Sequence, residues 1–211
     1  MLGESVINAG LTHSRALMPA VDALFDAVGL SPVDVDLIAA VTGPGSFTGV
    51  RIGVCAAKGL AMALNKPCAA VDALEALAKG TQHEGFICPL FDARRGQVYT
   101  ALFEKKEGVL LRLCEDVALP LADWLERLAG YETVLFTGDG LDVCEEVIRR
   151  DAKCKTLFAD GAARCLKASS ACLLAEACPE THMDAAKLAP LYLRLSQAER
   201  ERSERLTRQR A

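Results

Sequence analysis

The stretch GPGSFTGVRIGV, residues 43–54, joins a short apolar run to a long apolar segment. The run before it, residues 37–41, is bounded by turn residues and predicts a buried parallel strand. Its glycines open backbone conformations that are closed to other residues, and Ser46 or Thr48 can cap a helix that begins near Thr48. The stretch therefore predicts a strand, a tight loop and a helix, in that order.

The loop is also a candidate anion site, because free backbone N–H groups gather at a helix N-terminus. The Lys-Ser or Lys-Thr ending of a phosphate-binding P-loop is missing from it, and Thr48 stands where a dinucleotide fingerprint has its third glycine. A connection that merely needs glycine explains these residues at least as well. The candidate phosphate-binding or cofactor-binding residues are Gly43, Gly45, Ser46, Thr48 and Gly49.

The helix that follows is apolar on nearly every side. Between residues 50 and 64 only Arg51 and Lys58 are charged, and small residues are frequent. Gly53 and Gly59 each cost roughly 1 kcal/mol relative to alanine in a helix interior. Close packing must compensate for that cost, either inside this chain or against a partner chain.

Composition narrows the class of protein. The chain has 211 residues, 51% of them hydrophobic, and a formal net charge of -4, so it offers no broad basic face for nucleic acid. No apolar run reaches about 18 residues without a charged or polar break, and the N-terminus lacks the pattern of a signal peptide. The expected location is the cytoplasm.

Nine cysteines are scattered along the chain without a C-x-x-C pair. Their number is odd, and their neighbours are mostly alanine, valine and leucine. Single thiols in such surroundings behave as small apolar side chains in a reducing compartment. No disulfide framework and no metal site is expected from them.

Strands and helices alternate in both halves of the chain, which predicts an α/β architecture. The first half is expected to hold strands at residues 5–8, 37–41 and 68–71 and helices at residues 13–28, 48–64 and 74–79. The second half is expected to hold strands at residues 86–91, 97–104, 133–136 and 154–158 and helices at residues 121–129, 141–150 and 169–178.

The polar run at residues 80–85 marks the expected domain boundary. It divides the chain into a first subdomain, residues 1–84, a second subdomain, residues 85–197, and a charged tail, residues 198–211. The tail holds five arginines and three glutamates and carries +2, against -6 for the rest. A solvated helix end explains such a tail, and RNA contact is the alternative.

Four motifs resemble the TsaB (YeaZ) family, and together they span nearly the whole chain. They are THSR with LMP at residues 12–19, the glycine loop and helix at residues 43–61, DARRGQVY at residues 92–99, and PLYLR at residues 190–194. The resemblance implies the actin-like, sugar-kinase and Hsp70-like (ASKHA) ATPase fold, with two subdomains of related topology. It also implies an accessory subunit of the machinery that adds threonylcarbamoyl to the adenosine next to the anticodon of certain tRNAs.

The same resemblance implies that this subunit is not an enzyme. Its catalytic relative, TsaD, holds a metal with two histidines four residues apart, and Ala73 and Leu77 stand at the matching positions. An i, i+4 pair shares one helix face, but alanine and leucine have no lone pair to donate to a metal. No cofactor is therefore expected in this chain, and ATP and metal are expected in the partner subunits.

The beginning of the chain departs from the family pattern. The resemblance implies that family members begin with a strand that ends in an Asp-Thr-Ser phosphate loop and with a second strand, and we expect both to be absent ahead of residues 2–5. A start codon chosen too far downstream, a deletion or a trimmed chain would each explain their absence. The predicted strand at residues 5–8 would then lack its pairing partners. Unpaired edges and uncovered apolar surface favour partner binding or aggregation.

The expected partners are a TsaD-like catalytic subunit and a TsaE-like ATPase, with tRNA contacted indirectly and a homodimer through the same helices as an alternative. The helices that begin at His13 and Val50 would form the contact, in a helical bundle. Its expected members are Leu17, Val21, Leu24, Val50, Ile52, Gly53, Ala56 and Leu60.

Two enzyme classes remain as alternatives. A nucleotide-dependent phosphotransferase or hydrolase of the same fold would use the loops at residues 43–49 and 138–140 for phosphate, with Asp92 as an acid. A peptidase is less favoured, because His13, His83 and His182 stand beside no recognisable nucleophile motif.

Overall fold

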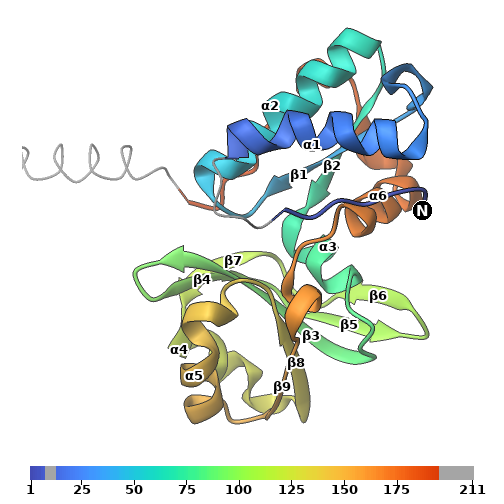
Figure 1. Cartoon of the computed structure of the whole chain (residues 1–211). Coiled ribbons are helices and arrows are strands. Elements are labelled where there is room, and N and C mark those ends of the chain that lie inside the picture. The colour runs from blue at the N-terminus through green and yellow to red at the C-terminus, as the bar shows by residue number, and fades with distance from the viewer. Residues whose placement is uncertain (8–12, 195–211) are drawn as a thin grey trace, which may run out of the picture.

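Helices and two β-sheets alternate in five layers in the computed structural model, which describes residues 1–7 and 13–194 (Figure 1). The upper lobe holds a helix layer and a three-stranded sheet, and a second helix layer separates it from the seven-stranded sheet and the last helices. The helices are α1 (His13–Val28), α2 (Phe47–Leu64), α3 (Ala73–Lys79), α4 (Leu121–Arg127), α5 (Leu141–Asp151) and α6 (Ala168–Ala177).

The first sheet has the order β1-β2-β10, with β1 (Ile38–Gly43), β2 (Cys68–Asp72) and β10 (His182–Met183). Strands β1 and β2 are parallel, because α2 crosses over between them. Small side chains cover both faces: Ala40 and Cys68 pack toward α2, and Ala69 and Val71 pack toward α6. These small residues let the helices approach the sheet closely.

The second sheet is built around the long strand β3 (Gly85–Arg94). Strands β4 and β5 follow one another along one side of β3, and β8 pairs with the other side. The remaining strands continue outward on the two sides. Their bounds are β4 (Gln97–Thr100), β5 (Phe103–Lys106), β6 (Val109–Arg112), β7 (Val117–Pro120), β8 (Thr133–Thr137) and β9 (Lys155–Phe158).

The largest apolar cluster lies between this second sheet and helices α4 and α5. Trp124 of α4 and Phe136 of β8 are both buried in it, and the Trp124 indole donates a hydrogen bond to Cys88 Sγ at 3.1 Å. Complete burial raises the pKa of the Cys88 thiol to about 12. This cysteine is therefore an inert core residue, as expected from its apolar neighbours.

Most predicted elements are confirmed within a residue or two, including the α/β fold class and the helix at residues 13–28. Ser46 caps α2, because its hydroxyl accepts a hydrogen bond from the Gly49 N–H. The predicted strand at residues 97–104 is wrong as a single strand, since Ala101 and Leu102 interrupt it between β4 and β5. Strands β6, β7 and β10 were not predicted, because they are short and lack a clear alternating pattern.

The predicted strand at residues 5–8 does not form over its described part. Val6 and Ile7 are 58% and 54% exposed, so no apolar face is buried that would hold them in a sheet. Glu4 instead accepts a hydrogen bond from the Ser169 N–H at the start of α6, which lowers the pKa of the Glu4 carboxyl. Residue 8 and the charged tail at residues 198–211 lie outside the described residues.

Charged side chains close both ends of α3, the helix between the two sheets. The Asp72 side chain caps the first turn of α3. The Arg112 guanidinium forms ion pairs with Asp72, at 3.0 Å, and with Glu75 and Asp116. Burial, together with the neighbouring Asp116 carboxyl, raises the pKa of Asp72 to about 7. At the other end the Lys105 ammonium donates to the Thr81 carbonyl at 2.6 Å.

Candidate functional site: a polar cleft and an apolar helix pair

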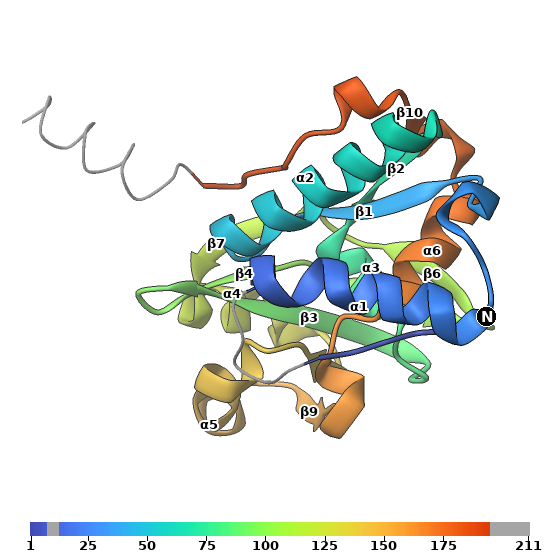
Figure 2. The same cartoon turned by 45° about the horizontal axis from the view of Figure 1, so that its top comes forward.

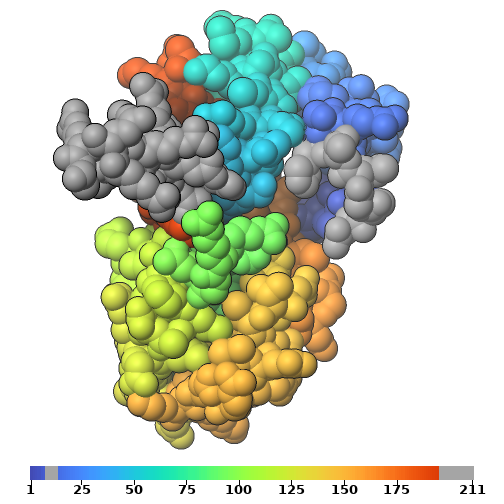
Figure 3. Space-filling model, turned by 90° about the vertical axis from the view of Figure 1, so that its left-hand side faces the viewer, coloured from blue at the N-terminus to red at the C-terminus, as the bar shows by residue number. Residues whose placement is uncertain are grey.

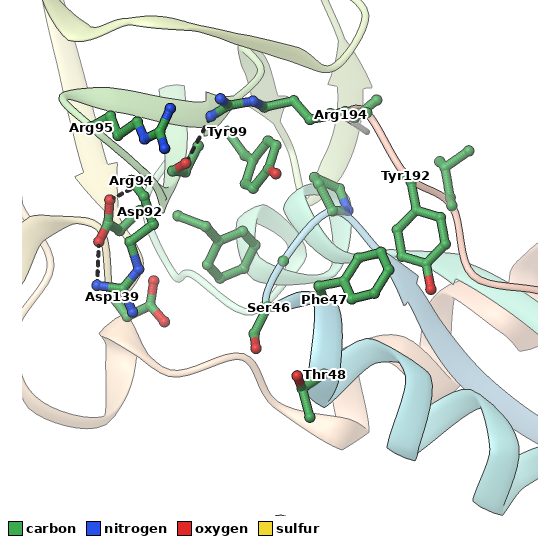
Figure 4. A pocket seen from close by; sticks show the side chains of 16 residues that line it. Ser46, Phe47, Thr48, Asp92, Arg94, Arg95, Tyr99, Asp139, Tyr192 and Arg194 are labelled. Atoms are coloured by element: carbon green, nitrogen blue, oxygen red, sulfur yellow. Dashed lines mark hydrogen bonds and ion pairs between the residues drawn. The ribbon is translucent and has the colours of Figure 1, made fainter. Parts of the chain in front are cut away.

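A polar cleft of about 380 Å³ lies between the two lobes. In Figure 3 the green tip of the β3–β4 hairpin is seen between the lobes, below α2. Figure 4 shows how the side chains of the cleft are arranged: Arg94, Arg95 and the carboxylates on one wall, Ser46, Phe47 and Thr48 at the start of α2, and Tyr192 and Arg194 on the segment after β10.

The last described segment runs beside the carboxyl end of β1. The Leu191 N–H donates to the Thr42 carbonyl at 2.8 Å, and a Cβ at residue 43 would collide with the Leu191 carbonyl oxygen. Gly43 also has φ +136°, a conformation that favours glycine. Gly43 is therefore explained by close backbone packing, without a ligand.

Aromatic side chains form one wall of the cleft. The rings of Phe47 and Tyr192 are stacked with their centroids 4.6 Å apart. The Arg51 guanidinium lies 4.1 Å from the Phe47 ring centroid, and its Nε donates to the Tyr192 hydroxyl at 2.8 Å. This stack ties the first turn of α2 to the segment that follows β10.

The opposite wall carries two carboxylates. Asp92 accepts from the Arg94 N–H at 2.7 Å and pairs with the Arg94 guanidinium at 3.1 Å. Partial burial raises the pKa of Asp139, and the carboxylates of Asp142 and Asp92 add to the effect. Asp139 belongs to the loop at residues 138–140, which is held against the middle of β3 by the bond from the Gly140 N–H to the Leu90 carbonyl.

The structure divides the predicted phosphate-binding residues among three places. Gly45, Ser46 and Thr48 line the cleft, Gly43 packs against Leu191, and Gly49 lines a different groove. The Ser46 hydroxyl is already engaged by the Gly49 N–H at 3.3 Å. The cleft can thus offer arginines, aromatic rings and two carboxylates to a ligand, while anion binding by the glycine loop stays a prediction.

An apolar groove of about 380 Å³ lies between α1 and α2, over β1. The two helices run side by side on the outer face of the first sheet (Figure 2). Six of the eight predicted interface residues line it, namely Leu17, Val21, Val50, Gly53, Ala56 and Leu60. Leu24 lies outside the groove and faces Gly3, and Ile52 is half-buried on another side of α2.

Helix α2 is unusually exposed for its composition. Only Val54, Ala57 and Ala61 of its 18 residues are buried. Among the described helices, α2 alone is long and apolar enough to cross a membrane by length and composition, and 17% of its residues are buried. In this fold it connects two parallel strands, and Lys58 donates to the Ala186 carbonyl at 2.7 Å.

Two glycines of α2, Gly53 and Gly59, face open space. A Cβ added at Gly53 or at Gly59 would meet no atom of the described chain within 4 Å. Close packing inside the described part of this chain therefore does not explain why these positions lack a side chain. Of the two explanations that the sequence allows, packing against another molecule fits the geometry better.

The two positions that the family resemblance matches to metal ligands lie on α3. Ala73 and Leu77 are both buried in the apolar interior between the two sheets. Among residues 1–7 and 13–194, no cluster of three histidine, cysteine, aspartate or glutamate side chains is placed to hold a metal ion. The α3 face thus contributes to the core.

Sequence reasoning missed Phe47, Tyr192 and Arg194 as cleft residues. Arg194 donates to the Ala93 carbonyl at 2.8 Å, although 101 positions separate the two residues. The sequence does mark these residues, because Tyr192 and Arg194 belong to the PLYLR motif and Ala93 belongs to the DARRGQVY motif. Only the fold shows that these two motifs meet.

Comparisons with known proteins agree on one group. A family model described as tRNA N6-adenosine threonylcarbamoyltransferase (TsaD) matches residues 8–202. The tRNA threonylcarbamoyladenosine biosynthesis protein TsaB of Bacillus subtilis is 39% identical over 201 residues, which is 94% of this chain and 87% of the relative. The TsaB protein of Escherichia coli is 36% identical over 99 residues, 46% of this chain and 43% of the relative. The solved structure of YeaZ from Pseudomonas aeruginosa has a TM-score of 0.72 at 28% identity, covering 87% of this chain and 86% of that one.

Proposed function

The chain belongs to the TsaB (YeaZ) family of tRNA threonylcarbamoyladenosine biosynthesis proteins, and we propose that it is a noncatalytic subunit that binds and activates a TsaD-like threonylcarbamoyltransferase. The catalytic subunit would carry the metal and transfer threonylcarbamoyl to tRNA, and a TsaE-like ATPase would join the assembly. The chain would contact tRNA through these partners, in the cytoplasm.

One observation carries the proposal: α2 is apolar enough to require cover, yet three of its 18 residues are buried by the chain itself. Exposed apolar surface that is contiguous and free of charge is characteristic of protein interfaces. The groove between α1 and α2 meets this description, because the side chains that line it are all apolar. Its glycines allow a partner helix to approach the α2 backbone closely.

The noncatalytic part of the proposal rests on α3. Two histidines at positions 73 and 77 would need open space and a metal between them, whereas Ala73 and Leu77 fill the core between the sheets. The Asp92 carboxylate of the cleft is already engaged by the Arg94 guanidinium at 3.1 Å and by the Arg94 N–H at 2.7 Å. Both observations favour a subunit that contributes shape to a complex.

The proposal is tested by binding to the TsaD protein of the same organism. Ala56→Glu places a carboxylate at the centre of the groove, and Ala63→Glu places one on an exposed side of α2 outside it. We expect Ala56→Glu to weaken the complex by at least ~100-fold, because an unpaired buried charge costs several kcal/mol. Ala63→Glu should leave the affinity unchanged.

Calorimetry or size-exclusion co-elution gives the affinity, and urea unfolding of each free variant shows that the fold is intact. If both glutamate variants bind TsaD as tightly as the wild type, the α1–α2 face is not the contact. Turnover of tRNA by the purified chain, with no other subunit present, would contradict the noncatalytic role.

The cleft supports a second candidate, a nucleotide-dependent phosphotransferase or hydrolase. Its arginines and stacked aromatic rings suit a phosphate-bearing ring compound, and Asp139, whose pKa is raised by burial, is the candidate acid of the site. Calorimetric titration with ATP and Mg²⁺ separates the two candidates. Micromolar binding that Arg95→Ala abolishes would favour this second function.

A further inference from the structure

Strand β6 and Leu113, the residue after it, present a row of exposed apolar side chains at the edge of the second sheet. Val109, Leu111 and Leu113 are 69%, 57% and 37% exposed, whereas Leu110 between them packs into the core. Alternate residues of a strand point to the same face, so these three side chains form one line. Among the described strands, β6 pairs with β5 alone, and its other edge is open.

The hairpin fixes which backbone groups of β6 are open. A two-residue turn, Glu107 and Gly108 with φ 50° and 77°, joins β5 to β6, so the flanking pair Lys106–Val109 is hydrogen-bonded. Hydrogen-bonded and non-bonded pairs alternate along an antiparallel ladder. The bond from the Leu113 N–H to the Leu102 carbonyl, 2.8 Å, continues this alternation. The N–H and C=O groups of Leu110 and Arg112 therefore point away from β5.

We propose that this edge pairs with β6 of a second copy of the chain, antiparallel, across a twofold axis at Leu111. Residues directly opposite each other on paired strands point to the same face, so an axis at Leu111 brings Leu111 against Leu111 and Val109 against Leu113 of the partner. The outward backbone groups of Leu110 then bond those of Arg112 in the other copy. This pairing would give hydrogen-bond partners to the open backbone groups and would bury the apolar side chains at the same time.

The charges around the strip are compatible with this register. On the apolar face, Glu104 lies across from Leu111 and Lys106 across from Val109 on β5, and the two form an ion pair at 2.8 Å. In the proposed dimer, Glu104 and Lys106 of each copy would lie beside the paired β6 strands, one β5 strand on each side of the axis, and neither would face a like charge. On the other face, Arg112 is already paired with Asp72, Glu75 and Asp116.

The proposed contact is separate from the α1–α2 groove. Strand β6 belongs to the lower lobe and the helix pair to the upper lobe (Figure 1). Two copies joined through β6 would each keep the groove free for another protein. Because the strip is one short strand, we expect a weak dimer of the small interface class, below about 1,200 Å².

Disulfide trapping tests the register. Leu111→Cys places two thiols across the axis in a close, non-hydrogen-bonded pair, so we expect oxidation to cross-link the chains. Val109→Cys is the matched control, since residue 109 faces residue 113 and its own copy lies about 13 Å along the strands. The Val109→Cys, Leu113→Cys double variant should cross-link again. All variants carry Cys55→Ser and Cys172→Ser, which remove the exposed native thiols.

Sedimentation velocity over a series of protein concentrations measures the dimer itself, with Ala56→Glu added to block association through the groove. Leu111→Lys should lower the association constant at least ~10-fold, because like charges would face each other. Val143→Lys, an equally exposed apolar position on α5, should not change it.

Cross-linking of Leu111→Cys and of the double variant, but not of Val109→Cys, supports the pairing. Equal cross-linking of Val109→Cys and Leu111→Cys would overturn the register. Neither cross-linking nor a concentration-dependent dimer would overturn the contact, and this result would leave TsaD binding through the groove unaffected.

Discussion

Helices α2 and α3 have similar compositions and opposite surroundings. Both follow a strand of the first sheet, and both are rich in alanine and leucine. Five of the seven residues of α3 are buried, against three of the 18 residues of α2. The apolar composition of a helix sets how much of its surface must be buried, and its position in the layers decides whether the same chain buries it.

The position of α3 explains its burial. It lies between the two sheets, and Asp72 and Lys105 satisfy the backbone groups at its two ends. Helix α2 packs on one sheet only, so most of its circumference faces solvent or the groove. Substitutions in α2, in α3 and at the two ends of α3 test this difference.

Truncating a side chain should be costly in α3 and harmless in α2. Leu74→Ala removes a completely buried side chain, and we expect it to lower the free energy of unfolding by about 2–5 kcal/mol. Met62→Ala, at a position of α2 that is 63% exposed, should change it by less than about 0.5 kcal/mol. Urea unfolding monitored by circular dichroism gives both values; equal costs would erase the contrast between the helices.

The cap of α3 should make stability depend on pH. The pKa of Asp72 is raised to about 7 from an ordinary 3.8, so the folded state binds this proton more strongly than the unfolded state. The contribution of the protonated Asp72 carboxyl to the free energy of unfolding is complete below about pH 4 and is lost as the pH rises through 7. Relative to Asp72→Asn, the wild type should lose roughly 1–3 kcal/mol between pH 4 and pH 8.

Asn keeps a side-chain oxygen for the cap, so the variant isolates titration from capping. The measurement is urea unfolding of both proteins across this pH range. A constant difference between them would show that Asp72 keeps an ordinary pKa in the folded state.

The other end of α3 depends on Lys105. Lys105→Met keeps the aliphatic stem but removes the bond to the Thr81 carbonyl, which would be left buried without this donor. We expect a loss of about 1–2 kcal/mol in the free energy of unfolding. Lys66→Met, whose ammonium pairs with an exposed Asp36 on the surface, is the control and should cost less than about 0.5 kcal/mol.

Adding a methyl group to α2 should separate stability from binding. Gly53→Ala and Gly59→Ala fill open space, so each should stabilise the free chain by about 0.5–1 kcal/mol through helix propensity. Gly53 lines the groove and Gly59 does not, so only Gly53→Ala should weaken TsaD binding. Thermal unfolding and calorimetry supply the two quantities. A loss of stability in either variant would show that the glycine is needed inside the chain.

Local sequence signals predicted most of the helices and central strands. The glycine loop gave the β1–α2 connection and its Ser46 cap, because cap and turn chemistry act over a few residues. The edge strands β6 and β7 were missed, since four-residue strands carry little pattern of their own. The strand at residues 5–8 was wrong because alternating residues form a strand only where a neighbour pairs with them.

The residues of the groove and of the cleft were also predicted only where short-range spacing determines their position. Six of the eight residues predicted for the partner contact line one groove, because helical spacing shows which side chains share a face, and their contact with a partner stays a prediction. Phe47, Tyr192 and Arg194 were not, since their contacts join segments more than 90 positions apart.

Residue types and short-range spacing were enough to give the α/β class, the family resemblance and the apolar character of α2. The tertiary structure alone decided which apolar surfaces the chain covers. It buries α3 between two sheets and leaves the α1–α2 groove and the β6 edge open. The reason is that burial is a property of packing between distant segments, which residue types in order do not specify.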